Sequence, residues 1–389
     1  MKKSTSLIYL VGFILLMAVG SIINIGDVKT SAEAAAAAGY KSAASEFGAK
    51  YVANFTARYD IVNLNGLIGK ALGIREMNGA LKLEDGSLVA PNYDRPWTGT
   101  RALMLAEFKS DLEEEGIPVW YVQYPSEICK YDTEPILSTE HTNETADMFV
   151  SEAAELGVDV LDLRESLHEE GIDHYEAFFK TDHHWTIETA FWAARGLTDF
   201  IGERLDVSVP EEYLTLDVYD CEVLEDSVLG SNGRKTGIGY AGLDSLELYT
   251  PRFDTDYVVN YEGKLKTGTF GEVILDRSFL EGNSLYEMNQ YNVYIGNDCG
   301  YMEIHNDEAP VDMKLFIVKD SFSRPVIAFL STVYSDIYAV DTRSYDATLN
   351  SGLSIRDYAV SLGVDAVLVA YNPAMLTMDE NFDFYGEMQ

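Results

Sequence analysis

Two stretches of the sequence alternate between helical and extended hydrophobic patterns, and this alternation constrains the fold most strongly. The helical patterns lie at 100–115, 144–156, 187–201, from 325 onward and at 354–362, and the extended apolar runs lie at 117–124, 158–163, 315–318, 337–340 and 366–370. Helices that alternate with short apolar strands predict an α/β domain built on a parallel sheet flanked by helices. We expect the two stretches to share one sheet.

The segment between the two stretches has a different pattern. Residues 206–312 show short extended runs with many Gly, Asn, Asp and Tyr residues and no long amphipathic helix. This pattern predicts a β-rich insertion. We therefore assign 51–205 plus 313–389 to the α/β domain and 206–312 to the insertion.

The N-terminus has the pattern of an export signal. Two lysines precede an apolar or small run from Leu7 to Ile25, which is nearly long enough to span a membrane. We expect residues 1–26 to be a signal anchor or a signal peptide, and favour an uncleaved anchor over cleavage in the small-residue tract 30–35. Residues 27–50, rich in Ala, Ser and Gly, are predicted to form a stalk. In either case the body of the chain is extracytoplasmic, anchored at the cell surface or secreted.

Charge and cysteine content narrow the classes of ligand. The chain has 28 Lys plus Arg against 64 Asp plus Glu, a formal net charge of −36, which disfavours nucleic acid and anionic lipid as ligands. Its three cysteines are widely spaced and form neither a disulfide framework nor a cysteine zinc site. The larger part of the acidity is explained by solubility alone.

A serine lies where the first strand of the second stretch gives way to a helix. The buried-strand pattern ends before Lys319-Asp320-Ser321-Phe322-Ser323, and Pro325 suits the first turn of the next helix. Free N–H groups and the helix dipole at such a turn can stabilise an oxyanion, so Ser321 is the candidate nucleophile and Ser323 the alternative. The competing interpretation is that these residues only cap the helix.

Asp182 and His184 could activate such a serine. An imidazole is an effective base when a carboxylate fixes its tautomer, and two residues apart on an extended segment the two side chains leave the same side of the backbone. On this geometry His183 points the other way. A metal site of His174, Asp182, His183 and His184 is the alternative, but adjacent histidines rarely converge on one ion, and we expect neither a metal nor a cofactor.

The two segments together resemble known families. Asp182-His183-His184-Trp185 spells the motif of the DHHW family of exported proteins, and the chain is more distantly similar to the SGNH-like O-acetyltransferases of alginate acetylation. The resemblance continues through 228–231, 319–322 and 340–345. In these families Asp and His precede Ser, which is a permuted order relative to ordinary SGNH esterases, and this chain has the permuted order.

The resemblance implies an SGNH-hydrolase-like fold and a catalytic triad of Ser321, His184 and Asp182. We identify no clear Gly-x-Asn oxyanion block, so the oxyanion donors are left open. The backbone N–H of Ser321 is one candidate. The candidates for binding the oxyanion or the substrate are Arg343, Asn372, Trp185 and Tyr345.

The expected function is O-acyl transfer, most simply acetyl transfer, onto an extracellular or cell-wall polysaccharide. By resemblance, the acyl donor is supplied through a membrane-bound O-acyltransferase. Two alternatives remain open: a carbohydrate esterase or deacetylase with the same triad, and a non-catalytic surface protein that binds glycans.

Overall fold

The computed structural model describes residues 57–94, 97–282 and 284–386. The predicted signal segment (1–26) and stalk (27–50) lie outside these residues. None of the helices within the described ranges is long and apolar enough to cross a membrane.

The described chain divides into two compact units. The smaller unit comprises the described residues up to Met77 together with Lys235–Tyr240, and it contains α4 (Arg58–Ala71) and β1 (Glu76–Met77). The larger unit comprises Asn78–Arg234 and the residues from Ala241 onward. All the residues of the candidate site belong to the larger unit.

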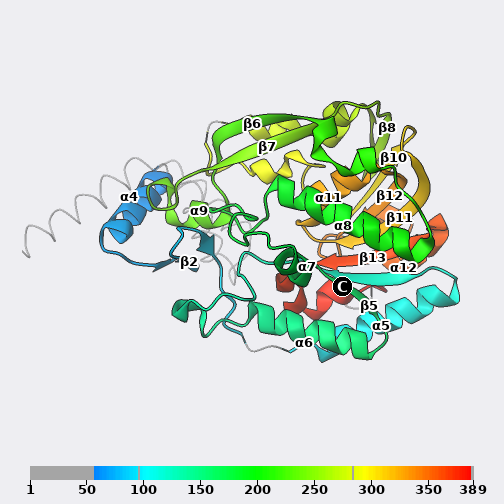
Figure 1. Ribbon diagram of the computed structural model, residues 1–389, viewed down its shortest axis with the longest axis horizontal. Helices are drawn as coiled ribbons and strands as arrows, with labels where there is room; N and C mark the ends of the chain where they lie inside the picture. Colours follow the sequence, from blue (N-terminus) through cyan, green and yellow to red (C-terminus); the bar gives the residue numbers. More distant parts are fainter. Residues whose placement is uncertain (1–56, 95–96, 283, 387–389) are drawn as a thin grey trace, which may run out of the picture. The chain divides into compact units, whose positions relative to one another are not determined.

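An eight-stranded sheet forms the centre of the larger unit (Figure 1). Its strands run in the order β5 (Asp159–Asp162), β4 (Val119–Gln123), β13 (Ala366–Tyr371), β11 (Val311–Lys319), β12 (Tyr334–Val340), β10 (Tyr301–Asn306), β8 (Tyr257–Tyr261) and β9 (Lys264–Gly268). The first five strands are parallel, and the last three continue the sheet in antiparallel pairing. The two alternating stretches therefore share one sheet, as predicted.

Helices cover both faces of this sheet. They are α5 (Gly99–Glu114), α6 (Thr142–Glu155), α7 (Leu163–Glu169), α8 (Ile187–Leu205), α11 (Ser323–Leu330) and α12 (Ile355–Leu362). Further strands are β2 (Ala80–Lys82) and β3 (Leu88–Val89), which pair with each other, and β6 (Tyr219–Val228) and β7 (Asp244–Pro251), which form a separate two-stranded sheet. The short helices include α9 (Ser231–Thr236) and α10 (Ile238–Ala241).

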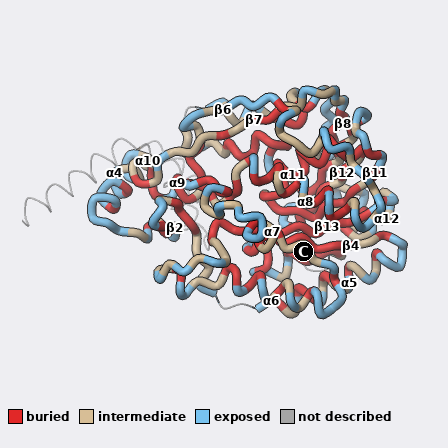
Figure 2. Tube along the Cα trace, in the orientation of Figure 1, coloured by how far each residue is buried: buried red, intermediate tan, exposed pale blue. Residues whose placement is uncertain are grey.

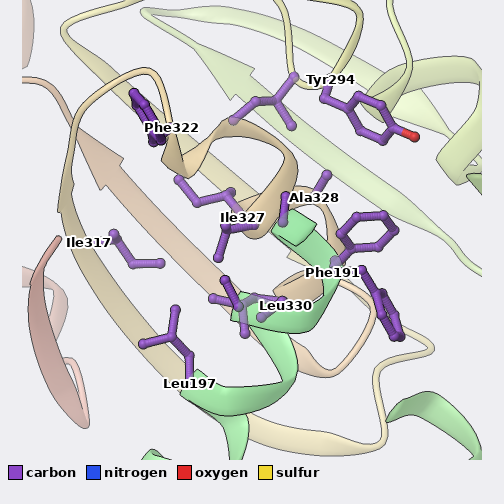
Figure 3. Packing of buried hydrophobic residues seen from close by; sticks show 14 of the residues in the cluster. Phe191, Leu197, Tyr294, Ile317, Phe322, Ile327, Ala328 and Leu330 are labelled. Atoms are coloured by element: carbon purple, nitrogen blue, oxygen red, sulfur yellow. The ribbon is translucent and has the colours of Figure 1, made fainter. Parts of the chain in front are cut away.

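Alternation along the strands builds two separate cores. Leu315 and Ile317 of β11 pack with α7, α8 and α11, whereas Phe316 and Val318 pack on the opposite face with α5, α6 and α12. Figure 2 shows the strands in the middle of the sheet, such as β13 and β11, as largely buried, and Figure 3 shows Ile317 near the side chains of α8 and α11. A parallel strand covered on both faces has a continuous apolar sequence, which is why 315–318 was recognisable as a strand.

The helices begin close to where capping residues predict. Thr186 is the N-cap of α8, and its hydroxyl accepts the N–H of Thr189; Ser354 caps α12 in the same way. Pro325 is the third residue of α11, in the first turn. The prediction of an α/β fold with a mostly parallel sheet is confirmed.

Residues 206–312 contribute strands in two places. Strands β8, β9 and β10 extend the central sheet, while β6 and β7 pair only with each other among the described residues. The boundaries of the insertion at 206 and 312 stay a prediction.

Candidate active site

Ser321 lies on the turn between β11 and α11, at the carboxyl edge of the sheet. The neighbouring Asp320 holds this turn with both carboxylate oxygens, because Oδ1 accepts the N–H of Phe322 at 2.9 Å and Oδ2 accepts the N–H of Asn372 at 2.6 Å. Burial raises the pKa of Asp320 to about 6, against these two amides, which lower it. The turn is thereby tied to the end of β13.

The two serines of this turn differ in access. Ser321 is partly exposed, whereas Ser323 is fully buried and its hydroxyl donates to the Tyr124 hydroxyl at 3.2 Å. The Ser321 backbone N–H donates to no acceptor among the described residues. Of the two candidate nucleophiles, Ser321 is therefore the one that a substrate can reach.

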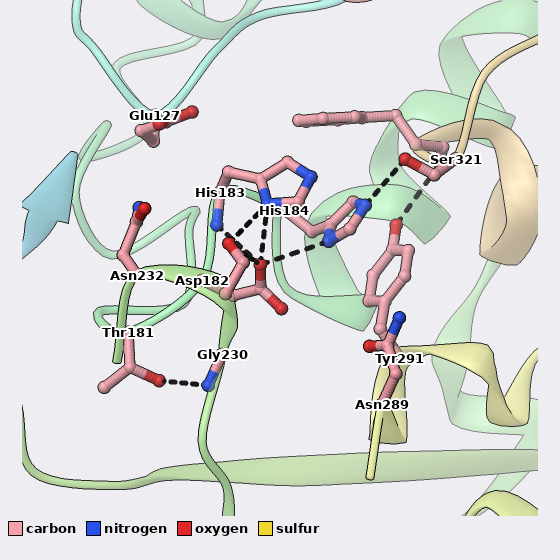
Figure 4. A network of polar contacts seen from close by, with 12 residues as sticks. Glu127, Thr181, Asp182, His183, His184, Gly230, Asn232, Asn289, Tyr291 and Ser321 are labelled. Atoms are coloured by element: carbon pink, nitrogen blue, oxygen red, sulfur yellow. Dashed lines mark hydrogen bonds and ion pairs between the residues drawn. The ribbon is translucent and has the colours of Figure 1, made fainter. Parts of the chain in front are cut away.

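His184 faces Ser321 across the site. Its Nε2 lies 2.8 Å from the Ser321 Oγ, although the two residues are 137 positions apart in the sequence (Figure 4). When Nδ1 carries the imidazole proton, Nε2 can accept the proton of the serine hydroxyl. Burial, followed by the charges of His183 and Arg324, lowers the pKa of His184 to about 3, while Asp182 acts to raise it. The resting imidazole is thus neutral, as a base must be.

Asp182 lies behind His184 and is buried. Its Oδ1 is 3.4 Å from the Nδ1 of His184, and this Nδ1 makes no hydrogen bond within the described residues. Burial acts to raise the pKa of Asp182, but the adjacent His184 and His183 outweigh burial and lower it well below its ordinary value. The carboxylate is charged beside a neutral imidazole, and a small approach would bring the pair into hydrogen-bond contact.

His183 does not point away from Asp182, in contrast to our prediction. Its Nδ1 is 2.9 Å from Asp182 Oδ1, and its ring centroid is 3.8 Å from that of His184. The prediction assumed an extended backbone, but residues 181–184 form a series of bends, so side chains do not alternate there. Both histidines therefore face the same carboxylate.

A loop after β6 supports Asp182 from the other side. The Ser231 hydroxyl donates to Asp182 Oδ1 at 3.0 Å, and the Gly230 N–H donates to the Thr181 hydroxyl at 2.8 Å (Figure 4). A Cβ on Gly230 would lie 2.3 Å from the Cβ of Asp182 and 2.4 Å from the carbonyl oxygen of Thr181. Only glycine can pass so close to the carboxylate-bearing backbone.

Tyr291 covers one face of His184. The two rings stack with centroids 3.9 Å apart and an angle of 13° between their planes. The Tyr291 hydroxyl accepts the indole N–H of Trp185 at 3.0 Å and donates to the carbonyl of Phe322 at 3.3 Å. Trp185 is fully buried, and its N–H also contacts that carbonyl at 3.1 Å. Tyr291 thus connects the histidine segment to the serine turn.

Charged side chains surround the other side of the serine turn. Lys319 is buried, and its Nζ lies 3.2 Å from both Asp298 Oδ1 and Asp341 Oδ2. Arg324 Nη2 lies 2.6 Å from Asp298 Oδ1. Burial acts to raise the pKa of Asp298, but Lys319 and Arg324 hold it well below its ordinary value. This network fixes Lys319 and Arg324, which flank Ser321 in the sequence.

Arg343 and Asn372, two of the residues predicted to bind the oxyanion or the substrate, form hydrogen bonds within the protein. Arg343 holds Asp341 with two nitrogens, at 2.8 and 2.6 Å, and its side chain remains about one third exposed. Asn372 donates its side-chain amide to the carbonyl of Pro125 at 3.0 Å and caps the next turn by accepting the N–H of Ala374. Their roles stay predictions.

The remaining predicted residues also have structural contacts. Tyr345 is buried and donates its hydroxyl to the carbonyl of Leu353 at 2.9 Å. His174 contacts the carbonyl of Ser126 at 2.9 Å and is outside the one group of potential metal-binding side chains in the described part of the chain. That group is Asp182, His183 and His184, in which one donor atom from each residue lies within 4.8 Å of the others.

Comparison with known proteins first gives the class of this chain. Residues 83–229 match the family model of the SGNH hydrolase-like domain of the acetyltransferase AlgX. The match contains Asp182 and His184 and ends before Ser321. With the parallel sheet flanked by helices, it identifies an SGNH hydrolase-like domain of the type found in the acetyltransferase AlgX.

Several solved structures have a fold similar to that of this chain. PatB1 of Bacillus cereus superimposes with a TM-score of 0.64 at 18% identity, over 78% of this chain and 99% of that chain. A DHHW family protein from Eubacterium siraeum superimposes with a TM-score of 0.60 at 19% identity, over 80% and 96%. PatB1 with a sulfonyl adduct gives 0.63 at 18% identity, over 79% and 98%. No curated protein matches the chain in sequence. The resemblance to the DHHW and AlgX-type proteins is confirmed, and these structures share its fold.

Proposed function

We propose that this chain is an exported O-acyltransferase, most simply an O-acetyltransferase, that modifies a polysaccharide through an acyl-enzyme on Ser321. The observation that carries the proposal is the 2.8 Å contact between His184 Nε2 and Ser321 Oγ, with the Asp182 carboxylate behind the imidazole. The SGNH hydrolase-like match and the export pattern of residues 1–26 support it.

The proposed reaction has two half-reactions. His184 Nε2 takes the proton of Ser321 Oγ as this oxygen attacks the carbonyl of the donor ester, and the donor alcohol leaves with that proton. The acyl-enzyme is then attacked by a sugar hydroxyl, whose proton passes to His184 and back to Ser321. The Ser321 N–H is the proposed first oxyanion donor, because it has no acceptor within the described chain.

The acceptor and donor are proposed by class only. The acceptor is a neutral or cationic region of an extracytoplasmic glycan, since a chain with a net charge of −36 disfavours a strongly anionic one. The acyl donor would be supplied through a membrane-bound O-acyltransferase near the proposed N-terminal anchor.

Ser321→Ala tests the nucleophile, and Ser323→Ala is its matched control on the same turn. We expect Ser321→Ala to lower turnover of a chromogenic acetyl ester by about 10⁴-fold or more, because triad members act as a unit. Ser323→Ala removes a buried hydroxyl whose one hydrogen bond to the described residues goes to Tyr124, and it should keep turnover within about tenfold. Undiminished acyl transfer by Ser321→Ala would refute the proposed nucleophile.

An acceptor assay separates the transferase from the esterase. Wild-type protein is incubated with the acetyl ester, with and without glycan fragments, and O-acetylated sugar is measured against free acetate. Acetylated sugar at the expense of free acetate supports transfer. Free acetate alone, whatever glycan is supplied, would establish the esterase instead, and absence of both with intact folding would favour the glycan-binding protein.

A further inference from the structure

Four polar side-chain atoms converge beside the proposed base. Asp182 Oδ1 lies 2.9 Å from His183 Nδ1, 3.4 Å from His184 Nδ1 and 3.0 Å from Ser231 Oγ. Ser231 Oγ also lies 2.7 Å from His183 Nδ1. Two imidazole nitrogens and a carboxylate oxygen are the donors that zinc and related divalent metals bind in proteins.

Two features distinguish this cluster from an ordinary hydrogen-bond network. His184 Nδ1 is buried, directed at the cluster and without a hydrogen bond in the described chain, so one strong metal donor is not used by the protein. His183 keeps 37% of its side chain exposed, which leaves a route for an ion from solvent. Ligand atoms about 2.0–2.1 Å from a tetrahedral zinc ion are roughly 3.3 Å apart. The distances from Asp182 Oδ1 to the two imidazole nitrogens, 2.9 and 3.4 Å, lie within a few tenths of an ångström of that value. The 2.7 Å distance from Ser231 Oγ to His183 Nδ1 would have to widen more.

We infer that Asp182, His183 and His184 form an inhibitory site for a divalent transition metal such as Zn²⁺, with Ser231 as a weaker fourth donor. The chemistry of the imidazole gives the reason for inhibition. A neutral imidazole whose Nδ1 binds a metal carries its single proton on Nε2. Nε2 then donates to Ser321 instead of accepting its proton, and the serine stays unactivated.

The site therefore differs from a catalytic metal centre. The ion would switch the histidine tautomer, displace any proton on His183 Nδ1, and leave the remainder of the fold in place. Because protonated imidazole competes with the metal, inhibition should weaken as the pH falls. The inhibition rests on the proposed function, but the binding itself does not.

The binding experiment uses the full-length Ser321→Ala protein, in which the nucleophile is absent and the metal donors remain. ZnCl₂ is titrated by calorimetry, and CoCl₂ by its visible absorption, which is intense for tetrahedral coordination. We expect one ion per chain, and His183→Gln in the same background should weaken binding at least about tenfold. Equal binding with His183→Gln, or the absence of a one-to-one site, would overturn the inference.

His305→Gln is the matched control. His305 is a partly exposed histidine that contacts two carboxylates, Asp336 at 2.8 Å and Asp307 at 3.0 Å, far from this cluster in sequence. Its replacement should leave the affinity unchanged, and a tenfold loss there would place the ion at His305 and refute the assignment.

Activity of the wild type separates this inference from the proposed function. Ester turnover should fall on addition of ZnCl₂ and return with a chelator, and His183→Gln should shift the inhibition midpoint at least about tenfold. One-to-one binding that His183→Gln weakens, in a protein without acyl transfer, would refute only the proposed function. Acyl transfer that Zn²⁺ does not inhibit would refute only the inhibitory site.

Discussion

At the scale of single residues, the orientation of His184 depends on more than Asp182. The carboxylate lies 3.4 Å from Nδ1 without a hydrogen bond, whereas the Tyr291 ring lies flat on the imidazole at a centroid distance of 3.9 Å. Stacking of this kind restricts rotation of the imidazole, and the Tyr291 hydroxyl is itself fixed by Trp185 and Phe322. Tyr291 is therefore a positioning residue in the proposed reaction.

Replacing Tyr291 should affect turnover more than substrate binding. We expect Tyr291→Leu to lower kcat by about 10²-fold, because a misplaced base is costly, and Tyr291→Phe by only about fivefold, because the ring remains while a hydrogen bond is lost. Steady-state kinetics on an acetyl ester measures both. Tyr294→Phe, whose hydroxyl contacts Glu247 and Tyr249, is the control. A rise in KM with unchanged kcat for Tyr291→Leu would contradict a positioning role.

At the scale of elements, the loop that follows β6 determines where Asp182 lies. Gly230 is in contact with the backbone of Asp182 and with Thr181, so an added methyl group cannot be accommodated without movement of the DHHW segment. The glycine thus links the position of the carboxylate to the two-stranded sheet of β6 and β7.

Gly230→Ala should damage both stability and activity. Overpacking of this size typically lowers the free energy of unfolding by about 1–3 kcal/mol, and displacement of Asp182 should reduce turnover by at least about tenfold. Gly196→Ala in α8 is the matched control, since its new Cβ would contact only Leu163, at 3.9 Å, and alanine favours a helix. Thermal unfolding and ester turnover measure the two effects. Wild-type behaviour of Gly230→Ala would show that the segment can move freely.

The sequence was most informative about regular elements. Strands such as 366–370 and the helix after Thr186 were predictable because burial on a strand or a helix face produces a periodic apolar pattern. The same reasoning was wrong for His183, where the backbone bends and periodicity does not apply. Ser321 and His184 were recognisable from their motifs, but their 2.8 Å contact required the fold.

Other site residues had no usable signal in the sequence. Tyr291, Ser231 and Asp298 lie in irregular segments or at the start of a short helix, each as a single polar or aromatic residue among many. The likeness through 228–231 pointed to the loop that contains Gly230 and Ser231, but not to what either residue contacts. Long-range contacts of loop residues depend on tertiary packing, which local patterns do not encode.

At the scale of the whole molecule, histidines that are largely or fully buried make stability depend on pH. Burial lowers the pKa of His174 to about 4, compared with about 6.5 in an unfolded chain. Between these values the unfolded chain binds more protons than the folded one, so the stabilisation is complete above pH 6.5 and is lost as the pH falls towards 4. Burial also lowers the pKa of His184, so this residue likewise makes the folded protein less stable as the pH falls.

His174→Gln should make this pH dependence shallower. The full pKa difference corresponds to about 3 kcal/mol of unfolding free energy. Because the His174 side chain is partly exposed, we expect its replacement to remove about 2 kcal/mol of the stability lost on acidification. Urea unfolding followed by tryptophan fluorescence at pH 7.5 and pH 4.5 measures the change in unfolding free energy for both proteins. If wild type and His174→Gln lost the same unfolding free energy between the two pH values, His174 would not be a source of the pH dependence.

The position of Tyr291 has a consequence for engineering. A minimal catalytic domain made by deleting residues 206–312 would retain Ser321, His184 and Asp182, yet it would remove Tyr291, Gly230 and the strands β8, β9 and β10 that complete the sheet. Such a truncation would leave the base without its stacking partner and its carboxylate without its neighbouring loop. A segment that carries none of the three proposed triad residues is thus needed to hold two of them in place.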